Sequence, residues 1–440
     1  MIHQINRHLF FLLLSAGLFF AGTVKSQSLS NDSLSLTSII SEVVQNHPMV
    51  KKAMEDLTNS DAKIGLAQSN YLPNVDFSSS YSRIGPIPTI SIPDMGKFSF
   101  VPHDNYGAAF NVTQILYDFG KTEKNISLEK QSKELNLKSV EQVKQKLSQA
   151  VIGNYFALVY LQEAIKIKDE QLNTLNEHLR FIQKKQETGS ATQYEILTTQ
   201  VRISTIGNQK TDLETAKQIQ VCQLNSLLGK PESSPEQVKN ELKIVIPALQ
   251  SDALIAAAMQ NRDEMKLASQ KAKLTEMRYQ ITDKQNNPVF SGFLSGGIKN
   301  GYTPYLYDPK ANFTAGIGIK IPVFDGKRKI YNLVQAKSAI LMNDQETEIV
   351  RRNIVEEVVE SQSNLKASQK KIEQSELQLR QATQAYSLAK VRFDSGVITN
   401  LELLEGSTAV SESRLMLLKS KIDFTVNVYK LKSAIGDRLY

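Results

Sequence analysis

The sequence predicts a mainly α protein with a small β part, in which long coiled-coil helical hairpins are joined to four short strands. Two observations lead to this fold class. First, residues 122–187 of the 440-residue chain contain no proline and only one glycine, Gly153. Apolar side chains recur there at steps of three and four, and a helix of this length would reach about 100 Å. Second, the landmarks of the first half of the chain recur in the second half. The apolar positions of the long stretch are Val140, Val143, Leu147, Val151, Tyr155, Leu158, Leu161, Ile165, Leu172, Leu175, Leu179 and Ile182.

The first 26 residues have the pattern of an export signal. Arg7 precedes an apolar run at 9–21, and the side chains of Val24 and Ser26 suit cleavage before Gln27. The alternative is a membrane anchor, but the run is short for a spanning helix. No later stretch is long and apolar enough for such a helix, so we expect an exported protein without one.

Composition excludes several classes of function. The formal net charge of +7 is mild and spread along the chain, which gives no case for a nucleic-acid partner. Cys222 is the only cysteine, and its helical surroundings predict a small buried apolar residue. The mature histidines, His47, His103 and His178, lack metal-ligand spacing. We therefore expect no enzyme, no cofactor and no bound metal.

The landmarks of the two halves keep a nearly constant distance along the chain. The offset is 215 residues before the strands and 207 after them, so the first half has about eight extra residues in its Pro-rich loop at 84–105. The two aspartates among these landmarks are each expected to help start a long helix. The matched pairs are Pro73 with Pro288, Asp118 with Asp325, Gly189 with Gly396, and Gly229 with Gly436.

Each half is expected to contain the same elements in the same order. A short helix leads to a proline, a strand pair follows, and a very long helix then turns at a lone glycine into a shorter returning helix. The expected ranges are a signal at 1–26, a first repeat at 27–230 with a helix at 36–70, a β-hairpin at about 74–117 and a tip near 189, a joining equatorial segment at 231–250, and a second repeat at 251–440 with a helix at 251–285, a β-hairpin at about 289–324 and a tip near 396.

Three of the four strands alternate between an apolar and a polar face, whereas the Gly-rich strand at 289–298 has less clear faces, and the length of the strands suits a tilted transmembrane strand. A sheet with open edges is unstable in hydrocarbon, and four strands are too few to close a barrel. We therefore expect several chains to contribute strands to one shared barrel, with the helices continuing below it as a shared tube. The residues expected to face lipid are Tyr106, Phe110, Val112, Phe313, Ile317 and Ile319.

The motifs at the helix junctions and tips resemble the TolC-like outer-membrane efflux protein family. They are LYDFGK at 116–121, IPVFDGKRK at 321–329, TGSATQYEILTT at 188–199 and SGVITNLELLEG at 395–406, and the resemblance covers nearly the whole mature chain. It implies a homotrimer with a 12-stranded β-barrel in the outer membrane of a Gram-negative bacterium and an α-barrel in the periplasm. It also implies passive export, by efflux or type I secretion, through a periplasmic adaptor that links the duct to an inner-membrane transporter.

The two tips are the first candidate site. A helix hairpin needs a residue that accepts positive φ, which Gly189 and Gly396 do. The returning helices are expected to be capped by Thr192 and Thr399, or by Ser190 and Asn400 nearby. A plain turn without a partner is the alternative to the adaptor contact that the family implies. The adaptor-contact residues would be Thr188, Gly189, Ser190, Ala191, Thr192, Ser395, Gly396, Val397, Ile398 and Thr399.

Acidic residues that follow the tips are the second candidate site. By resemblance, Glu402 and Glu405 hold the positions that ring the periplasmic aperture, and Glu195 is the first-repeat counterpart of Glu402. Such rings would favour cations. The alternative is a solvated helix face. For the whole protein, the alternative function is a periplasmic or secreted coiled-coil scaffold without channel activity.

Overall fold

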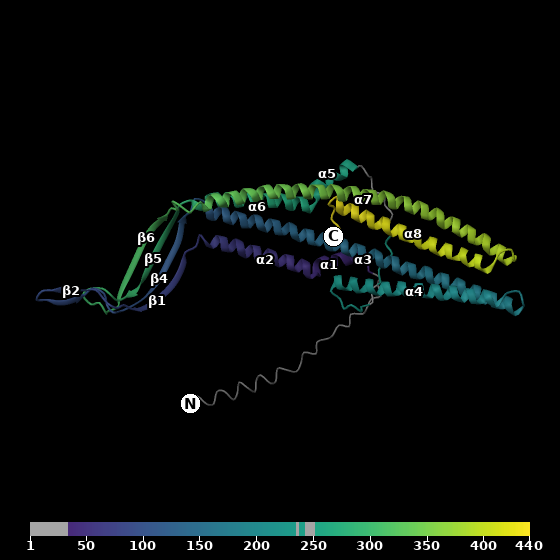
Figure 1. Ribbon diagram of the computed structural model, residues 1–440, viewed down its shortest axis with the longest axis horizontal. Helices are drawn as coiled ribbons and strands as arrows, with labels where there is room; N and C mark the ends of the chain where they lie inside the picture. Colours follow the sequence, from purple (N-terminus) through teal and green to yellow (C-terminus); the bar gives the residue numbers. More distant parts are fainter. Residues whose placement is uncertain (1–33, 235–236, 243–250) are drawn as a thin grey trace, which may run out of the picture.

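The computed structural model describes residues 34–234, 237–242 and 251–440. The chain is a long rod with the strands at one end and two helix turns at the other (Figure 1). The signal expected at 1–26 lies outside the described residues, as do 235–236 and 243–250 of the expected joining segment. None of the helices in the described part of the chain combines the length and apolar character that crossing a membrane requires.

Four antiparallel strands form the main sheet. They are β1 (Asn74–Arg83), β4 (Asp104–Tyr117), β5 (Val289–Lys299) and β6 (Lys310–Lys320). Their order across the sheet is β1-β4-β5-β6, so the inner pairing of β4 with β5 joins the two halves of the chain. Strands β1 and β6 each keep one unpaired side, and these two sides are the open edges of the sheet.

The register of the sheet separates a polar from an apolar face. Hydrogen bonds link the polar row, because the Asn111 amide donates to Asp76 over 3.1 Å and the Ser295 hydroxyl donates to Asn111 over 2.8 Å. The next row along the strands is apolar apart from one glycine. The polar row is Asp76, Asn111, Ser295 and Thr314, and the apolar row is Phe77, Phe110, Gly296 and Phe313.

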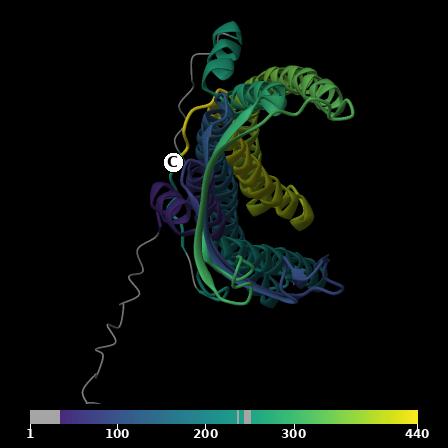
Figure 2. The ribbon, with the colours of Figure 1, turned by 90° about the vertical axis from the view of Figure 1, so that its left-hand side faces the viewer.

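The helices form one curved layer that continues from the sheet. Near the strands the lateral order is α2 (Pro48–Ser69), α3 (Lys121–Glu187), α6 (Asp263–Asp283) and α7 (Arg328–Asp394). A short turn, η1 (Lys284–Asn286), leads from α6 to β5. Seen end on, sheet and helices follow an open arc (Figure 2).

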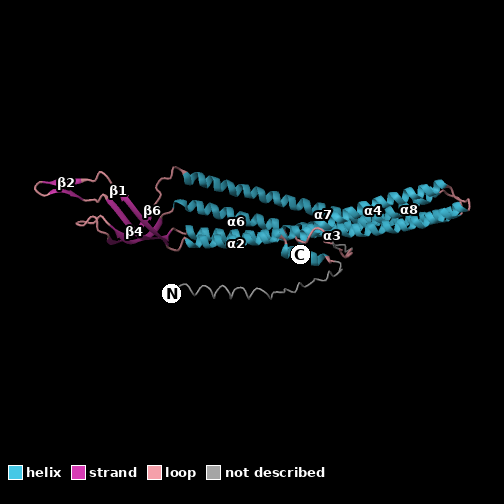
Figure 3. Cartoon of the chain, turned by 90° about the horizontal axis from the view of Figure 1, so that it is seen from below, coloured by secondary structure: helices cyan, strands magenta, loops and turns pink. Residues whose placement is uncertain are grey.

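Near the turns, the returning helices replace the short ones in this layer. Helix α8 (Asn400–Ala434) packs between α7 and α3, and α4 (Gln193–Leu228) packs on the far side of α3. The layer therefore ends at α7 on one side over its whole length. On the other side it ends at α2 near the sheet and at α4 near the turns, along the lower side of Figure 1. In the view from below, the helices lead from the magenta strands at one end to the two turns at the other (Figure 3).

Each short helix of the expected fold is broken in two. The first break separates α1 (Leu36–Asn46) from α2, because Pro48 has no N–H to continue the helix and keeps His47 extended. The second separates α5 (Ser251–Asn261) from α6 at Arg262, which has extended backbone angles without a following proline. Neither break is predicted from the sequence.

The long helices begin at the two matched aspartates, as predicted. The buried Asp118 carboxylate accepts the Thr122 backbone N–H over 2.7 Å, and the Asp325 carboxylate accepts the Lys329 backbone N–H over 2.9 Å. Both interactions satisfy a free donor of the first helical turn. Further along α3, the predicted apolar positions are largely buried. Val140, Leu147, Val151, Tyr155, Leu158, Leu161, Leu175 and Ile182 are all buried.

The segment between β1 and β4 differs from the expected Pro-rich loop. It contains a separate two-stranded ribbon, β2 (Thr89–Ile92) and β3 (Gly96–Ser99). The ribbon projects beyond the end of the main sheet, at the far left of Figure 1. Apolar residues occupy every second position of β2, which is typical of a strand. Prolines on both sides of this short stretch led to the prediction of a loop instead.

Candidate functional site: the hairpin tips

The two tips have the same turn. Gly189 and Gly396 have φ values of +74° and +73°, a region that other residues enter only at a cost. Behind each glycine the chain closes back on the helix, since Ser190 N–H donates to Lys185 O and Val397 N–H donates to Arg392 O, both over 2.8 Å. Such bonds satisfy carbonyl groups that a helix end leaves free.

The two returning helices also begin in the same way. The Thr192 hydroxyl accepts the Glu195 N–H over 3.3 Å, while the Glu195 carboxylate accepts the Thr192 N–H over 2.7 Å. Thr399 and Glu402 repeat these bonds at 3.3 Å and 2.7 Å. Each pair is a capping box, which satisfies two free donors at once. The threonine caps were therefore predicted correctly, whereas the nearby alternatives Ser190 and Asn400 are not the caps.

This capping changes the interpretation of the expected acidic aperture. The carboxylates of Glu195 and Glu402 turn back onto their own helix starts. Hydrogen bonds from the Thr399 backbone and hydroxyl hold the pKa of Glu402 below its usual value. Glu405 lies one turn further along α8, and its side chain is exposed. Of the three acidic residues, Glu405 is thus the one outside the capping boxes.

Asn400, directly after the second cap, links the two hairpins. Its side-chain amide donates to Glu195 O over 3.2 Å and to the Thr199 hydroxyl over 3.1 Å. Its amide oxygen accepts from His178 Nε2 over 2.6 Å, since an amide oxygen can only accept. Asn400 is only 3% exposed, so these bonds satisfy a buried group. The sequence pattern predicts Asn400 only as an alternative cap, so this link between the hairpins is a new finding.

Apolar packing supports this link. Ile182, Ile196, Phe393 and Leu403, one from each long or returning helix, form a buried cluster behind the tips. The Lys185 ammonium lies 5.1 Å from the centre of the Phe393 ring, which is a cation–π contact between the hairpins. The tips of one chain are therefore held as a single four-helix unit.

A polar layer that is buried at Lys168, Gln171 and Ser411 joins α3 to α4 and α8 further from the tips. The Lys168 ammonium donates to Gln209 over 2.9 Å, and the Ser411 hydroxyl donates to Gln171 over 2.7 Å. Burial lowers the pKa of Lys168. Buried polar groups in a coiled coil fix the register of the helices, because any other register leaves them unpaired.

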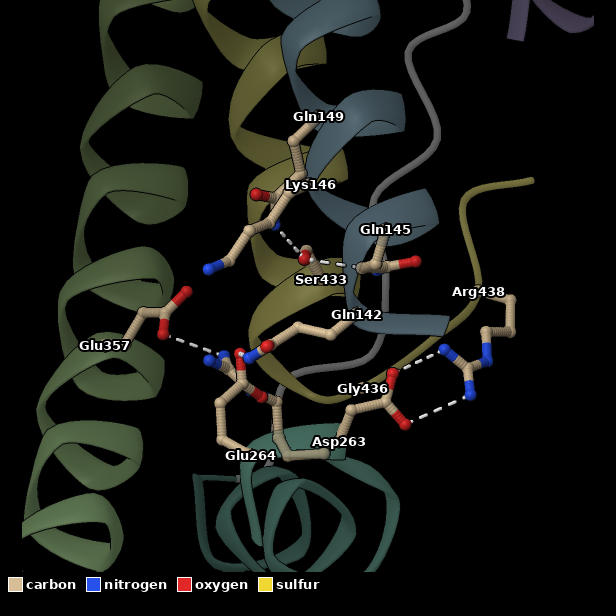
Figure 4. Close-up of a pocket in the computed structure, with 11 residues that line it drawn as sticks. Gln142, Gln145, Lys146, Gln149, Asp263, Glu264, Glu357, Ser433, Gly436 and Arg438 are labelled. Carbon is tan, nitrogen blue, oxygen red and sulfur yellow. Dashed lines mark hydrogen bonds and ion pairs between the residues drawn. The ribbon is translucent and has the colours of Figure 1, made fainter. Parts of the chain in front are cut away.

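A second feature that the sequence analysis missed lies at the middle of the rod. Arg438, near the end of the chain, binds the buried Asp263 carboxylate through two nitrogens at 2.5 and 3.1 Å (Figure 4). Arg262 bonds Glu264 over 2.9 Å and Glu357 over 2.8 Å. These pairs border a cavity of about 230 Å³ between α3, α6, α7 and the last turn of α8. The arrangement attaches the C-terminal residues to the corner between α5 and α6.

The six residues expected to face lipid share one face of the main sheet by register. Phe110, Phe313, Ile317 and Ile319 are strongly exposed, whereas Val112 is half-buried. Tyr106 lies on the same face, and its hydroxyl donates to the backbone carbonyl of Tyr307. Contact of this face with lipid remains a prediction.

Two other expectations concern single side chains. Cys222, predicted to be buried, is exposed, because α4 packs mainly against α3, with smaller contacts to α1 and α8, and Cys222 lies on an uncovered side. Among the described residues, no group of three or more His, Cys, Asp or Glu side chains is arranged to hold a metal ion.

A two-faced sheet that continues into a curved single layer of helices defines a wall segment of a tubular channel protein. Comparison with known proteins gives the family. The family model described as outer membrane efflux protein matches residues 39–230 and 254–437. The chain belongs to the outer membrane efflux protein family, which places it in the outer membrane as an efflux channel protein. The coiled-coil scaffold without channel activity is thereby set aside.

Individual relatives are similar over nearly their whole length. The chain is 20% identical to nodulation protein T of Rhizobium leguminosarum bv. trifolii, covering 91% of this chain and 85% of the relative. It is 21% identical to outer membrane efflux protein BepC of Brucella suis, covering 96% and 90%. The crystal structure of the outer membrane protein VceC from Vibrio cholerae superposes with a TM-score of 0.75 at 18% identity, covering 92% and 97%.

Proposed function

We propose that three copies of this chain close into one tube that passively conducts substrates across the outer membrane and much of the periplasm. Each copy would supply four strands to a 12-stranded barrel and one curved helical layer to the tube below it. Export energy would come from an inner-membrane transporter, reached through a periplasmic adaptor at the tips. Membership in the family supports this arrangement. The main argument for it comes from the open edges of the sheet and of the helical layer.

The distribution of exposed apolar side chains is the central observation. Helices α3 and α7 both have 67 residues, yet α7 exposes ten large apolar side chains and α3 exposes two. Helix α3 lies inside the layer, whereas α7 forms one of its edges. The ten are Ile330, Tyr331, Val334, Leu341, Met342, Ile349, Val359, Leu377, Leu388 and Val391.

The opposite edge has a matching character. Helix α2 exposes Met49, Met54 and Leu66, and α4 exposes Tyr194, Leu197 and Val201. Large exposed apolar patches on a protein commonly mark contact surfaces. We therefore place the edge formed by β1, α2 and α4 of one copy against the edge formed by β6 and α7 of the next. This contact between copies is called the seam below.

The same arrangement also lets the two edge strands form hydrogen bonds. Strand β1 runs away from the helices and β6 runs back toward them, so a β1–β6 contact between copies is antiparallel like every other pair in the sheet. Closing the ring in this way pairs the free N–H and C=O groups that a single copy would expose to hydrocarbon.

The tips are proposed as the adaptor contact, with residues 188–192 and 395–399 as the contacting turns. Their backbone is fixed by the glycine turns and capping boxes, which lowers the entropy lost on binding. For the aperture, Glu405 is the proposed charged ring, because Glu195 and Glu402 use their carboxylates for capping.

Disulfide trapping tests the seam. In a Cys222→Ser background, Ser80→Cys in β1 is combined in turn with Lys310→Cys, Asn312→Cys or Thr314→Cys in β6. One of these pairs should form covalent dimers and trimers in outer-membrane preparations. As a matched control, Ser80→Cys is combined with Ser295→Cys in β5, an inner strand flanked on both sides. Free monomer in every β6 combination would reject the shared barrel.

A further inference from the structure

The ribbon formed by β2 and β3 has one apolar and one polar face. Ile90 lies opposite Phe98 in the register, and Ile92 lies opposite Gly96, so these apolar side chains share a face. Ser91 and its partner Lys97 point to the other face. Ile90 and Phe98 are 54% and 41% exposed. An isolated two-stranded ribbon is marginally stable in water, so an uncovered apolar face on it calls for a partner.

The position of the ribbon indicates which surface covers this face. The ribbon follows β1, the edge strand, and its stem is held by the bond from Ile84 N–H to His103 O over 2.8 Å. In the end-on view it projects past the β1 side of the arc, away from β4, β5 and β6 of its own chain (Figure 2). It therefore overhangs the place where the proposed seam begins.

The next copy would present a specific loop at that place. Because β6 begins at the end of the sheet far from the helices, residues 300–309, which precede β6, lie at the same end as the ribbon. This loop exposes Tyr305 and Tyr307 by 65% and 55%. The loop is held in shape, since Gly301 N–H donates to Leu306 O over 2.8 Å and the Tyr106 hydroxyl donates to the Tyr307 carbonyl.

We propose that the ribbon of each copy packs its Ile90 and Phe98 face onto Tyr305 and Tyr307 of the next copy. The contact rests on the shared barrel proposed above and extends its seam beyond the membrane. It joins aliphatic and aromatic side chains that are exposed in a single chain, and it leaves Ser91 and Lys97 toward water. The ribbon occupies the segment in which the first half of the chain is about eight residues longer than the second.

Crosslinking between copies tests this contact. In the Cys222→Ser background, Phe98→Cys is combined with Tyr305→Cys and treated with a short bismaleimide. Dimers and trimers should appear on a denaturing gel, because the reacting side chains belong to different copies. The matched control replaces Phe98→Cys by Ser91→Cys, on the polar face of the same ribbon, and should yield several-fold less crosslinked product.

The seam pair in β1 and β6 separates this inference from the proposed function. If the seam pair forms disulfides but the Phe98–Tyr305 pair gives only monomer, the ribbon contact is rejected and the shared barrel stands. If neither pair links copies, both proposals fail. If Phe98→Cys alone gives dimers, the ribbons meet one another over the axis, which also rejects the contact with the loop.

A stability measurement provides a second readout. Ile90→Ser combined with Phe98→Ser should lower the temperature at which the trimer dissociates in detergent, because the apolar contact between copies is lost. Ser91→Ala combined with Lys97→Ala, on the opposite face, should leave that temperature unchanged. Equal dissociation temperatures for the two double variants would count against the proposal even if crosslinks form.

Discussion

The two hairpin tips share a turn and a cap but differ in the residue that follows the cap. In the first tip this residue is Gln193, which is exposed and bonds Gln186 of its own hairpin. In the second tip it is Asn400, which is buried and bonds four residues of the first hairpin. A duplicated local pattern thus fixes two equal turns, while the unequal position after the cap adds a hydrogen-bonded link to the apolar packing between the hairpins.

Replacing either tip glycine by proline is expected to have the largest effect on the shared turn. Gly189→Pro and Gly396→Pro each force φ to about −65°, whereas the turns need +74° and +73°. We expect each substitution to destabilise its tip by about 3 kcal/mol or more and to abolish export. Export assays together with adaptor crosslinking from the tips check this. Full export with unchanged crosslinks in either variant would show that the turn has no role in the adaptor contact.

The difference between the tips predicts unequal effects for two matched alanine variants. Asn400→Ala leaves the half-buried His178 Nε2–H without its acceptor, which costs about 1–3 kcal/mol, while the Thr199 hydroxyl and the Glu195 carbonyl keep their bond to each other. Gln193→Ala should change stability by less than about 0.5 kcal/mol, because its side chain is exposed. Hydrogen exchange of the α4 and α8 amides near the tips measures both, at about tenfold for each 1.4 kcal/mol. Similar exchange in the two variants would contradict the proposed link between hairpins.

The capping boxes predict a smaller effect of equal size in both tips. Thr192→Ala and Thr399→Ala each remove the hydroxyl that accepts the Glu195 or Glu402 N–H, at a cost of about 1 kcal/mol. Fraying of the first turn of α4 or α8, observed by hydrogen exchange, is the expected result. Thr→Ser at the same positions keeps the hydroxyl and serves as the control. A cost confined to one tip would show that the two caps are not equivalent.

The smallest expected effect is a pH dependence at the second tip. The folded-state pKa of Glu402 lies below its usual value of 4.5, so its stabilising contribution is present above that value and is lost as the pH falls through the lowered pKa. Exchange protection of the first turn of α8 should therefore decrease on acidification. Glu402→Gln keeps a capping side chain without a titrating group and should remove this decrease. The same acid sensitivity in Glu402→Gln would assign it to another group.

Local patterns predicted the local features of the fold well. Gly189, Gly396 and the two threonines were identified because a turn and a cap depend on neighbours within a few residues. The wall-like fold followed from heptad spacing and strand alternation for the same reason. These patterns occur in both halves of the sequence, so a prediction made for one half can be compared with the matching residues of the other.

Features that depend on distant contacts were missed. The partners of Asn400 are more than 200 residues away in the sequence. The residues next to Asn400 therefore give no local pattern that predicts these hydrogen bonds. The break at Arg262 has no proline, and its surroundings are fixed by ion pairs with α6 and α7. Cys222 was wrongly predicted as buried because a helical pattern alone does not show which helix forms an edge of the layer.

The one-layer architecture also has a genetic consequence. A wall segment has no closed interior of its own, so in the proposed trimer each copy needs both of its long edges intact. A copy with a mutation in one edge would still present its intact edge to wild-type copies. It would therefore be incorporated into mixed trimers. Damage on α7 or α4 is thus expected to act dominantly in cells that carry both alleles.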